Sequence, residues 1–163
     1  MEYKTAIVIV STKGAAGERE DRVGPALAER LAGSGYQCSP AIIVTDSREA
    51  VSSLLVKLID REGYDLVLTS GGTGLSPSDV TPEATLDVAE REIRGLAEAM
   101  RAAGRAITPH ADLSRAVVVQ RRQSLIINLP GSPKGALENL EVVLPALKHG
   151  LDKIKGDPSD CAR

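Results

Sequence analysis

Short runs of β-branched and aliphatic residues alternate with helix-type patterns along the whole chain, and this alternation restricts the fold more than any other feature. Residues 5–10 are apolar on both faces, as a central strand of a parallel sheet is. Further strands are predicted at 41–44, 64–70, 116–119 and 125–127. Strands that alternate with helices favour a layered α/β fold with right-handed crossovers.

Capping residues predict where the intervening helices begin. Pro25 fits the first turn of a helix over 24–32, and Ser47 is an N-cap for the next helix. Thr81 as N-cap, with Pro82 in the first helical position, begins a third helical stretch.

The second half of the chain contains three features that could break its regular elements. Gly95 and Gly104 are predicted to interrupt the helical stretch that continues towards Ala106, and residues 120–123 are predicted to close a hairpin. The final helix has a continuous apolar stripe, inside which Pro145 should kink or divide it. That stripe consists of Leu137, Leu140, Leu144, Leu147, Leu151 and Ile154.

The chain of 163 residues fits a single domain over 1–156, followed by a polar tail at 157–163 that we expect to be disordered. An apolar fraction of 42% is enough to bury a core. A net charge of −2, with three Tyr and neither Phe nor Trp, provides neither a basic patch nor stacking rings, so nucleic acids and membranes are not expected partners. With no signal-peptide pattern, no membrane-spanning run and only two cysteines, we expect a cytoplasmic protein.

The loop after the predicted strand 64–70 has the composition of a phosphate-binding site. Its glycines allow backbone N–H groups to converge on an anion, and two hydroxyl side chains add donors. The loop matches neither the Walker pattern nor the Gly-x-Gly-x-x-Gly pattern, and a plain chain reversal is the alternative. The candidate binding residues are Ser70, Gly71, Gly72, Thr73 and Gly74.

A second candidate loop joins the strand 125–127 to the last helix. The free N–H groups and the dipole of a helix start favour a bound anion. A Pro-Gly turn with a serine cap explains the same residues without a ligand. Residues 11–14, after the first strand, form a third and weaker candidate loop. The candidate binding residues are Asn128, Pro130, Gly131, Ser132 and Lys134.

Asp79 follows the first glycine loop by five residues, and Asp46 follows the second predicted strand. A carboxylate beside a phosphate site repels the ligand unless a cation lies between them, which Mg²⁺ could provide. Both residues could instead be ordinary turn or helix-entry residues.

The remaining reactive side chains do not suggest covalent catalysis. Cys38 lies in or beside a strand, and no Gly-x-Ser-x-Gly elbow is present. His110 and His149 are more typical of surface or packing residues, and Arg121 and Arg122 of a solvated hairpin tip.

Three stretches together carry a resemblance to a known family. Residues 70–74 (Ser-Gly-Gly-Thr-Gly), 79–85 (Asp-Val-Thr-Pro-Glu-Ala-Thr) and 128–133 (Asn-Leu-Pro-Gly-Ser-Pro) resemble the molybdopterin adenylyltransferases. This family includes the bacterial Mog proteins, the G domain of gephyrin and a related plant domain. The resemblance extends from the first strand to about Gly156, and residues 91–96 and 145–151 also look familial.

The resemblance implies a three-layer α/β sandwich of the Rossmann-like Mog type, with a mostly parallel sheet, assembled as a homotrimer. It implies transfer of AMP from Mg-ATP to the terminal phosphate of molybdopterin with release of pyrophosphate, in molybdenum cofactor biosynthesis. Delivery of the product to a molybdenum-insertion protein is a further expected interaction. Asp79 matches the acidic residue that the family needs for activity, here also the expected metal ligand, and Asp46 matches a second acidic catalytic position.

This chain departs from the family pattern at three positions. Val23 replaces the serine of Asp-x-Ser-Gly-Pro, Thr12 replaces the aspartate of Ser-Asp, and Ser47 replaces the glutamate after Asp46. Two other functions therefore remain open at this point. One is a molybdopterin-binding or trimeric scaffold protein without catalysis, and the other is a nucleotide-binding or nucleotide-hydrolysing relative.

Overall fold

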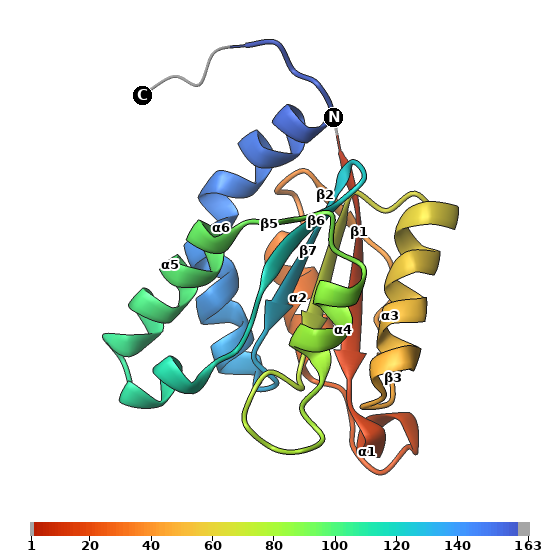
Figure 1. The fold of residues 1–163 in the computed structure, drawn as a ribbon, viewed down its shortest axis with the longest axis vertical. Coiled ribbons are helices and arrows are strands. Elements are labelled where there is room, and N and C mark those ends of the chain that lie inside the picture. Colours follow the sequence, from red (N-terminus) through yellow and green to blue (C-terminus); the bar gives the residue numbers. More distant parts are fainter. Residues whose placement is uncertain (1, 160–163) are drawn as a thin grey trace.

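The computed structural model describes residues 2–159 and has a seven-stranded mixed sheet at its centre (Figure 1). The sheet order is β2-β1-β4-β7-β6-β5, and β3 pairs with β1 beyond the end of β2. Neighbours are parallel from β2 to β7, whereas β6 is antiparallel to both β7 and β5. The strands are β1 (Tyr3–Val10), β2 (Tyr36–Cys38), β3 (Ile42–Val44), β4 (Leu66–Ser70), β5 (Arg91–Glu92), β6 (Val118–Arg121) and β7 (Ser124–Leu129).

Helices cover both faces of the sheet, which confirms the predicted layered α/β fold. One layer contains α2, α5 and α6, and the other contains α3 and α4. The helices are α1 (Thr12–Ala15), α2 (Val23–Leu31), α3 (Arg48–Val56), α4 (Thr81–Asp87), α5 (Arg94–Arg105) and α6 (Pro133–Ile154). A π-helical turn, η1 (Lys57–Arg61), extends α3, and a 3₁₀ helix, η2 (Pro109–Leu113), follows α5.

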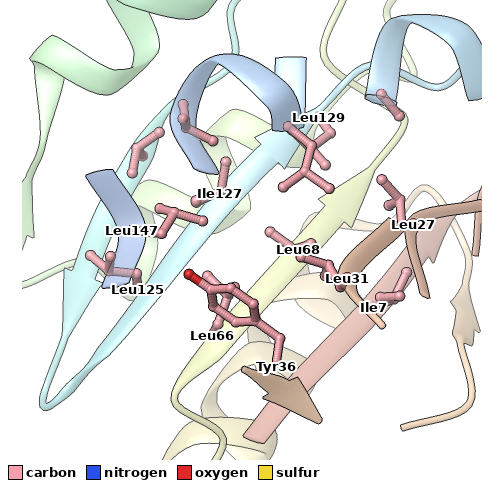
Figure 2. Close-up of a cluster of buried hydrophobic side chains, with 14 of the residues drawn as sticks. Ile7, Leu27, Leu31, Tyr36, Leu66, Leu68, Leu125, Ile127, Leu129 and Leu147 are labelled. Atoms are coloured by element: carbon pink, nitrogen blue, oxygen red, sulfur yellow. The ribbon is translucent and has the colours of Figure 1, made fainter. Parts of the chain in front are cut away.

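Each face of the sheet has its own hydrophobic core because the central strands are apolar on both sides. Ile7 of β1 packs in the layer of α2 and α6, whereas the adjacent Val8 packs under α3 and α4. Figure 2 shows the first core, with Leu31 of α2 and Leu147 of α6 on the same face of the sheet as Leu68 of β4. Burial of both faces fixes the register of β1 and β4, and therefore where their carboxyl ends lie.

The predicted helical stretch from 81 to 106 is wrong in two respects, the place of its break and the effect of its glycines. The helix ends at Asp87, the chain forms the short strand β5, and α5 then runs through Gly95 and Gly104 without interruption. Pairing of β5 with β6, with flanking bonds such as Ile93 N–H to the Val118 carbonyl at 2.7 Å, outweighs the local helical pattern. The strand β2 was also missed, because three residues are too few to show an alternating pattern.

Four further predictions can be compared with the structure. The hairpin between β6 and β7 is confirmed, and α6 is one continuous element, so Pro145 does not divide it. The N-cap of α4 is Val80, because the Thr81 hydroxyl donates to the Gly71 carbonyl instead. Arg121 is not a solvated tip: its side chain is 20% exposed and pairs with Asp60.

The carboxyl ends of β1, β4 and β7 lie together at the end of the sheet where the loop after β4 projects, at the bottom of Figure 1. The crossover after β1 leads to β2 on one side, and β4 is followed by connections to β7 on the other. Ligands of such sheets bind at this switch in strand order. Within residues 2–159, no helix is both long and apolar enough to cross a bilayer. Of the expected tail, only 157–159 are described, and Cys161 lies outside the described residues.

Candidate functional site

The two predicted phosphate loops are in direct contact at this end of the sheet. The Ser70 hydroxyl donates to the Pro130 carbonyl at 2.7 Å, and Gly71 N–H donates to the Leu129 carbonyl at 3.1 Å. A Cβ atom placed on Gly131 would lie 3.4 Å from the Gly71 Cα atom. The parallel pairing of β4 with β7 therefore brings together two loops that are about 60 residues apart in the sequence.

The glycines of the first loop have a conformation that other residues adopt only with strain. Gly71 and Gly72 have φ values of +101° and +67°. A Cβ on Gly71 would lie 2.5 Å from the Val10 carbonyl oxygen, and one on Gly72 would lie 2.4 Å from the Thr81 Oγ1 atom. In the described part of the chain, the backbone N–H groups of 72–74 donate no hydrogen bond, so they remain available to an anion.

A large cleft of about 920 Å³ opens on one side of the paired loops. Gly71, Gly72 and Gly131 line it together with the loop that follows β1. Three cationic side chains, those of Lys13, Arg19 and Arg22, also line this first cleft, as do the carboxylates of Glu20, Asp21 and Asp46.

A smaller cleft of about 320 Å³ lies on the other side of the same loops. Thr73, Gly74 and Pro130 line this second cleft, and most of its wall comes from α5, η2 and the first turns of α6. The segment between η2 and β6 and Asn128 of β7 contribute the remainder. The apolar part of that wall includes Met100, Ile107 and Leu113, and the polar part includes Arg101, His110, Glu138 and Asn139. The two glycine loops thus form a common wall between a charged cleft and a more apolar one.

The loop before α6 uses its serine as a helix cap, as the alternative without a ligand predicts, and its role as an anion site stays a prediction. The Ser132 hydroxyl oxygen accepts a hydrogen bond from Gly135 N–H at 3.1 Å and caps α6, whose first residue is Pro133. In residues 2–159, the N–H groups of Gly131 and Ser132 have no acceptor. Lys134 adds a positive charge beside them, with a side chain that is 83% exposed.

The Asp79 carboxylate is half-buried and bends back onto its own loop. Its Oδ2 atom accepts a hydrogen bond from Ser76 N–H at 2.9 Å, and a Cβ on Gly74 would lie 2.9 Å from the same oxygen. Its Oδ1 atom receives no hydrogen bond from the described residues, so one carboxylate oxygen remains available to a cation. The structure places Asp79 beside the glycine loop, although neither cleft is lined by it directly.

Asp46 lies in the first cleft and is held by Thr12, one of the three residues at which this chain departs from the family pattern. Its Oδ2 atom accepts hydrogen bonds from the Thr12 N–H at 2.7 Å and from the Thr12 hydroxyl at 2.8 Å. In return, the Asp46 N–H donates to the Thr12 hydroxyl oxygen at 3.1 Å. The threonine therefore orients the single carboxylate at this position.

Two predicted binding residues use their side chains inside the protein. The Asn128 amide is fully buried: it donates to the hydroxyls of Thr69 and Thr85 at 2.9 Å and accepts from Val117 N–H at 3.2 Å. The buried Ser70 hydroxyl donates to the Pro130 carbonyl, as described above. These two side chains connect the loops to the sheet. Both residues also lie at the clefts, because Ser70 lines the first cleft and Asn128 lines the second. Their contact with a ligand stays a prediction.

No sequence signal pointed to Arg115, which lies against the loop that carries Asp79. Its guanidinium donates to the Gly74 carbonyl at 2.8 Å and to the Asp79 carbonyl at 2.7 Å, and it pairs with the Glu83 carboxylate. Burial acts to raise the pKa of Glu83, but the hydrogen bond and charge of Arg115 outweigh it and leave the pKa below its ordinary value. Arg19 was also missed, because it lies in a polar stretch without a motif, whereas Lys13 falls in the third candidate loop and Arg22 in the Asp-x-Ser-Gly-Pro element.

Known proteins are similar to this chain in both fold and sequence. A family model described as a probable molybdopterin binding domain matches residues 6–149. A molybdopterin adenylyltransferase of Helicobacter pylori strain J99 is 40% identical over 155 residues, covering 93% of this chain and 87% of that protein. One from Haemophilus influenzae is 41% identical over 156 residues, covering 94% and 78%. A crystal structure of the molybdopterin biosynthesis enzyme MoaB from Thermus thermophilus is 48% identical, with a TM-score of 0.90 over 97% of this chain and 99% of that chain.

Proposed function

The chain belongs to the molybdopterin adenylyltransferase family, and we propose that its paired glycine loops catalyse the reaction of that family. In this reaction, AMP passes from Mg-ATP to the terminal phosphate of molybdopterin and pyrophosphate is released. The observation that carries the proposal is the common wall: the two predicted phosphate loops touch, and a cleft opens on each side of them. Such a wall allows two anionic substrates to meet at their phosphates while their ring systems lie apart.

We place the nucleotide in the first cleft and the pterin in the second. The larger cleft has room for ATP, and Lys13, Arg19 and Arg22 offer charges for a triphosphate. The smaller cleft is flanked by Met100, Ile107 and Leu113, whose apolar surfaces suit a flat ring. Asn139, Glu138 and Arg101 add the polar groups that could recognise the edge of a pterin.

The chain's own contribution to the reaction is positioning and charge stabilisation. An attacking phosphate monoester needs no protein nucleophile, because its oxygen bonds to the α-phosphorus as pyrophosphate leaves. The unpaired N–H groups of 72–74 and of Gly131 and Ser132 are donors for the negative charge that develops between the two substrates. Fixed donors of this kind stabilise the transition state without reorganising during the reaction.

The residues present fit a magnesium ion bound mainly through substrate. Within residues 2–159, no cluster of three or more His, Cys, Asp or Glu side chains could hold a metal ion. Mg²⁺ needs only one or two carboxylates when substrate phosphates and water complete its octahedron. Asp79 would supply a ligand through its unused Oδ1 atom, and Asp46 would supply a second charge on the nucleotide side. When bound, the ion supplies neutralisation of phosphate charge.

The same family membership supports a proposal for the assembly and the cellular setting. We propose a homotrimer that works in the cytoplasm, where ATP is available, and that delivers its product to a molybdenum-insertion protein. Sedimentation equilibrium is expected to give three times the 17.1 kDa subunit mass. A stable species of one subunit mass would contradict the trimer.

The reaction is tested by incubating the purified protein with Mg-ATP and molybdopterin and measuring adenylylated molybdopterin and pyrophosphate. We expect both products in equal amounts, and neither when molybdopterin is omitted. Pterin binding without product would favour the non-catalytic scaffold. Pyrophosphate release without molybdopterin would favour a nucleotide-hydrolysing relative.

A further inference from the structure

We propose that Arg115 is a positioning residue for adenylyl transfer, which holds the loop 73–79 so that the Asp79 carboxylate stays at the glycine loop. The inference rests on the proposed role of Asp79. Arg115 lies 36 residues further along the chain, between η2 and β6, and it belongs to neither predicted loop.

Arg115 is the external anchor of this loop. Its backbone N–H donates to the Thr73 carbonyl at 2.9 Å, and its guanidinium donates to the carbonyls of Gly74 and Asp79. In the part of the chain that the structure describes, these are the hydrogen bonds that residues outside the loop make to 73–79. The other bonds there are internal, such as Asp79 N–H to the Ser76 carbonyl at 2.8 Å.

The guanidinium binds both ends of the loop at once. Gly74 and Asp79 are separated by four exposed residues, 75–78. Hydrogen bonds to the carbonyls of Gly74 and Asp79 therefore hold the two ends of this exposed segment at a fixed separation. The third contact, to Glu83 in the first turns of α4, fixes the guanidinium itself relative to the sheet. A planar fork with several donors can make all three contacts, whereas a lysine ammonium on a flexible stem cannot reproduce them.

Arg115 also connects the second cleft to the Asp79 loop. Its neighbours Ser114 and Ala116 line that cleft, and Arg101 on α5 donates to the Ala116 carbonyl at 2.9 Å. The segment that borders the proposed pterin site therefore carries the side chain that sets the position of Asp79. Loss of this side chain should affect the reacting end of the substrates more than the binding of the ring.

Arg121 provides a matched control at the opposite end of the sheet. It also donates to a backbone carbonyl, that of Val88 at 3.1 Å, and also pairs with a carboxylate, that of Asp60. Neither cleft is lined by it. Arg121→Lys therefore removes a similar set of bonds without touching the Asp79 loop.

The experiment compares Arg115→Lys and Arg121→Lys by three measurements: the Mg²⁺ dependence of single-turnover adenylation, amide hydrogen exchange over 74–79, and thermal unfolding. For Arg115→Lys we expect the Mg²⁺ concentration at half-maximal rate to rise at least ~10-fold, the scale of losing a group that orients a metal ligand. Exchange over 74–79 in the substrate-free protein should become faster, and molybdopterin affinity should stay at the parental value. Arg121→Lys should lower the unfolding temperature and change neither the Mg²⁺ dependence nor the exchange over 74–79.

The same substitution in an Asp79→Asn background separates this inference from the proposed function. If Arg115 acts through Asp79, Arg115→Lys causes no further loss of rate there. A parental Mg²⁺ dependence and loop exchange in Arg115→Lys, with an impaired Asp79→Asn, would overturn this inference and leave the proposed function intact. An unimpaired Asp79→Asn would overturn the role of Asp79 itself, and the inference with it.

Discussion

The region around the β6–β7 hairpin and the two glycine loops at the other end of the sheet differ in how their polar groups are paired. At the amino end of the central strands, near the β6–β7 hairpin, polar side chains pair within the chain. The Lys155 Nζ atom lies 2.6 Å from the Asp65 Oδ1 atom, and Arg121 pairs with Asp60. The Ser124 hydroxyl donates to the Tyr64 carbonyl at 2.7 Å. At the carboxyl end, the N–H groups of 72–74 and one Asp79 oxygen have no partner among residues 2–159.

This difference separates stability from function. A paired polar group contributes to folding and is costly to break, whereas an unpaired donor at the surface adds little to folding and is available to a ligand. We therefore expect substitutions of paired groups to lower stability, and substitutions of Asp79 or of the residues with unpaired groups in the glycine loops to change catalysis or binding with little effect on stability.

Asp79→Asn should have the largest effect and should act on catalysis alone. The amide retains the size and turn-forming ability of the side chain but removes the charge. The single-turnover rate of adenylation should fall at least ~100-fold, the scale of losing one electrostatic stabiliser, while the free energy of unfolding changes by less than ~1 kcal/mol. Asp87→Asn, which removes a carboxylate far along α4, is the control and should adenylate normally. A parental rate in Asp79→Asn would make Asp79 a turn residue only.

Asp60→Asn tests the amino end. The hydrogen bond from Arg121 lowers the pKa of the Asp60 carboxyl, whose side chain is only 14% exposed. Loss of its charge leaves two arginines without their partner and should reduce the free energy of unfolding by about 2 kcal/mol. Urea unfolding measures the loss, and the adenylation rate of the folded protein should be unchanged. A large loss of rate would break the separation between the two ends.

Ser132→Asp places a negative charge at the start of α6, where we expect a substrate phosphate. Aspartate is also a good N-cap, so folding should be preserved. Molybdopterin affinity should fall by about 10-fold, or ~1.4 kcal/mol. Ser132→Asn, a neutral cap of similar size, should bind nearly as well as the parent. Equal affinity for both variants in a direct titration would mean that the loop is only a turn.

Glu83→Gln should have the smallest effect, and one that depends on pH. Arg115 holds the folded-state pKa of Glu83 below the ordinary value of 4.5, so the charged pair stabilises fully above that pH. Its contribution is lost as the pH falls through the folded-state pKa. Because the Glu83 side chain is 36% exposed, the free energy of unfolding of the parent should exceed that of Glu83→Gln by less than ~1 kcal/mol at pH 7. The difference should shrink as the pH falls below 4.5, and urea unfolding at a series of pH values from 7 downwards measures it. A difference that stays constant over the whole series would mean that Glu83 acts by packing alone.

Local signals in the sequence were sufficient for the parts of the fold that local chemistry determines. The apolar runs located β1 and β4, and Ser47 and Ser132 cap their helices as predicted. The break between α4 and α5 could not be predicted in this way, because it depends on pairing of β5 with a strand almost 30 residues away.

The residues of the candidate site also divide into those that the sequence predicts and those that it does not. The glycine loops were recognisable because strained φ values and close backbone approach require glycine. Arg115 was not recognisable, because its role depends on three contacts with residues 32 to 41 positions away and on no motif of its own. Asn128 stays a predicted binding residue and lines the second cleft, but its three hydrogen bonds inside the protein could not be predicted, because the sequence does not show which way a side chain points.

Amide chemical shifts measured during titration with Mg²⁺ and a non-transferable ATP analogue test the central claim most directly. They report on every backbone N–H of both ends of the sheet in one experiment and require no substitution. We predict that the amides of 72–74, Gly131 and Ser132 shift on binding, while those of the hairpin at 121–124 do not. Shifts concentrated at the hairpin, or binding that leaves both glycine loops unchanged, would contradict the assignment of function to the carboxyl end.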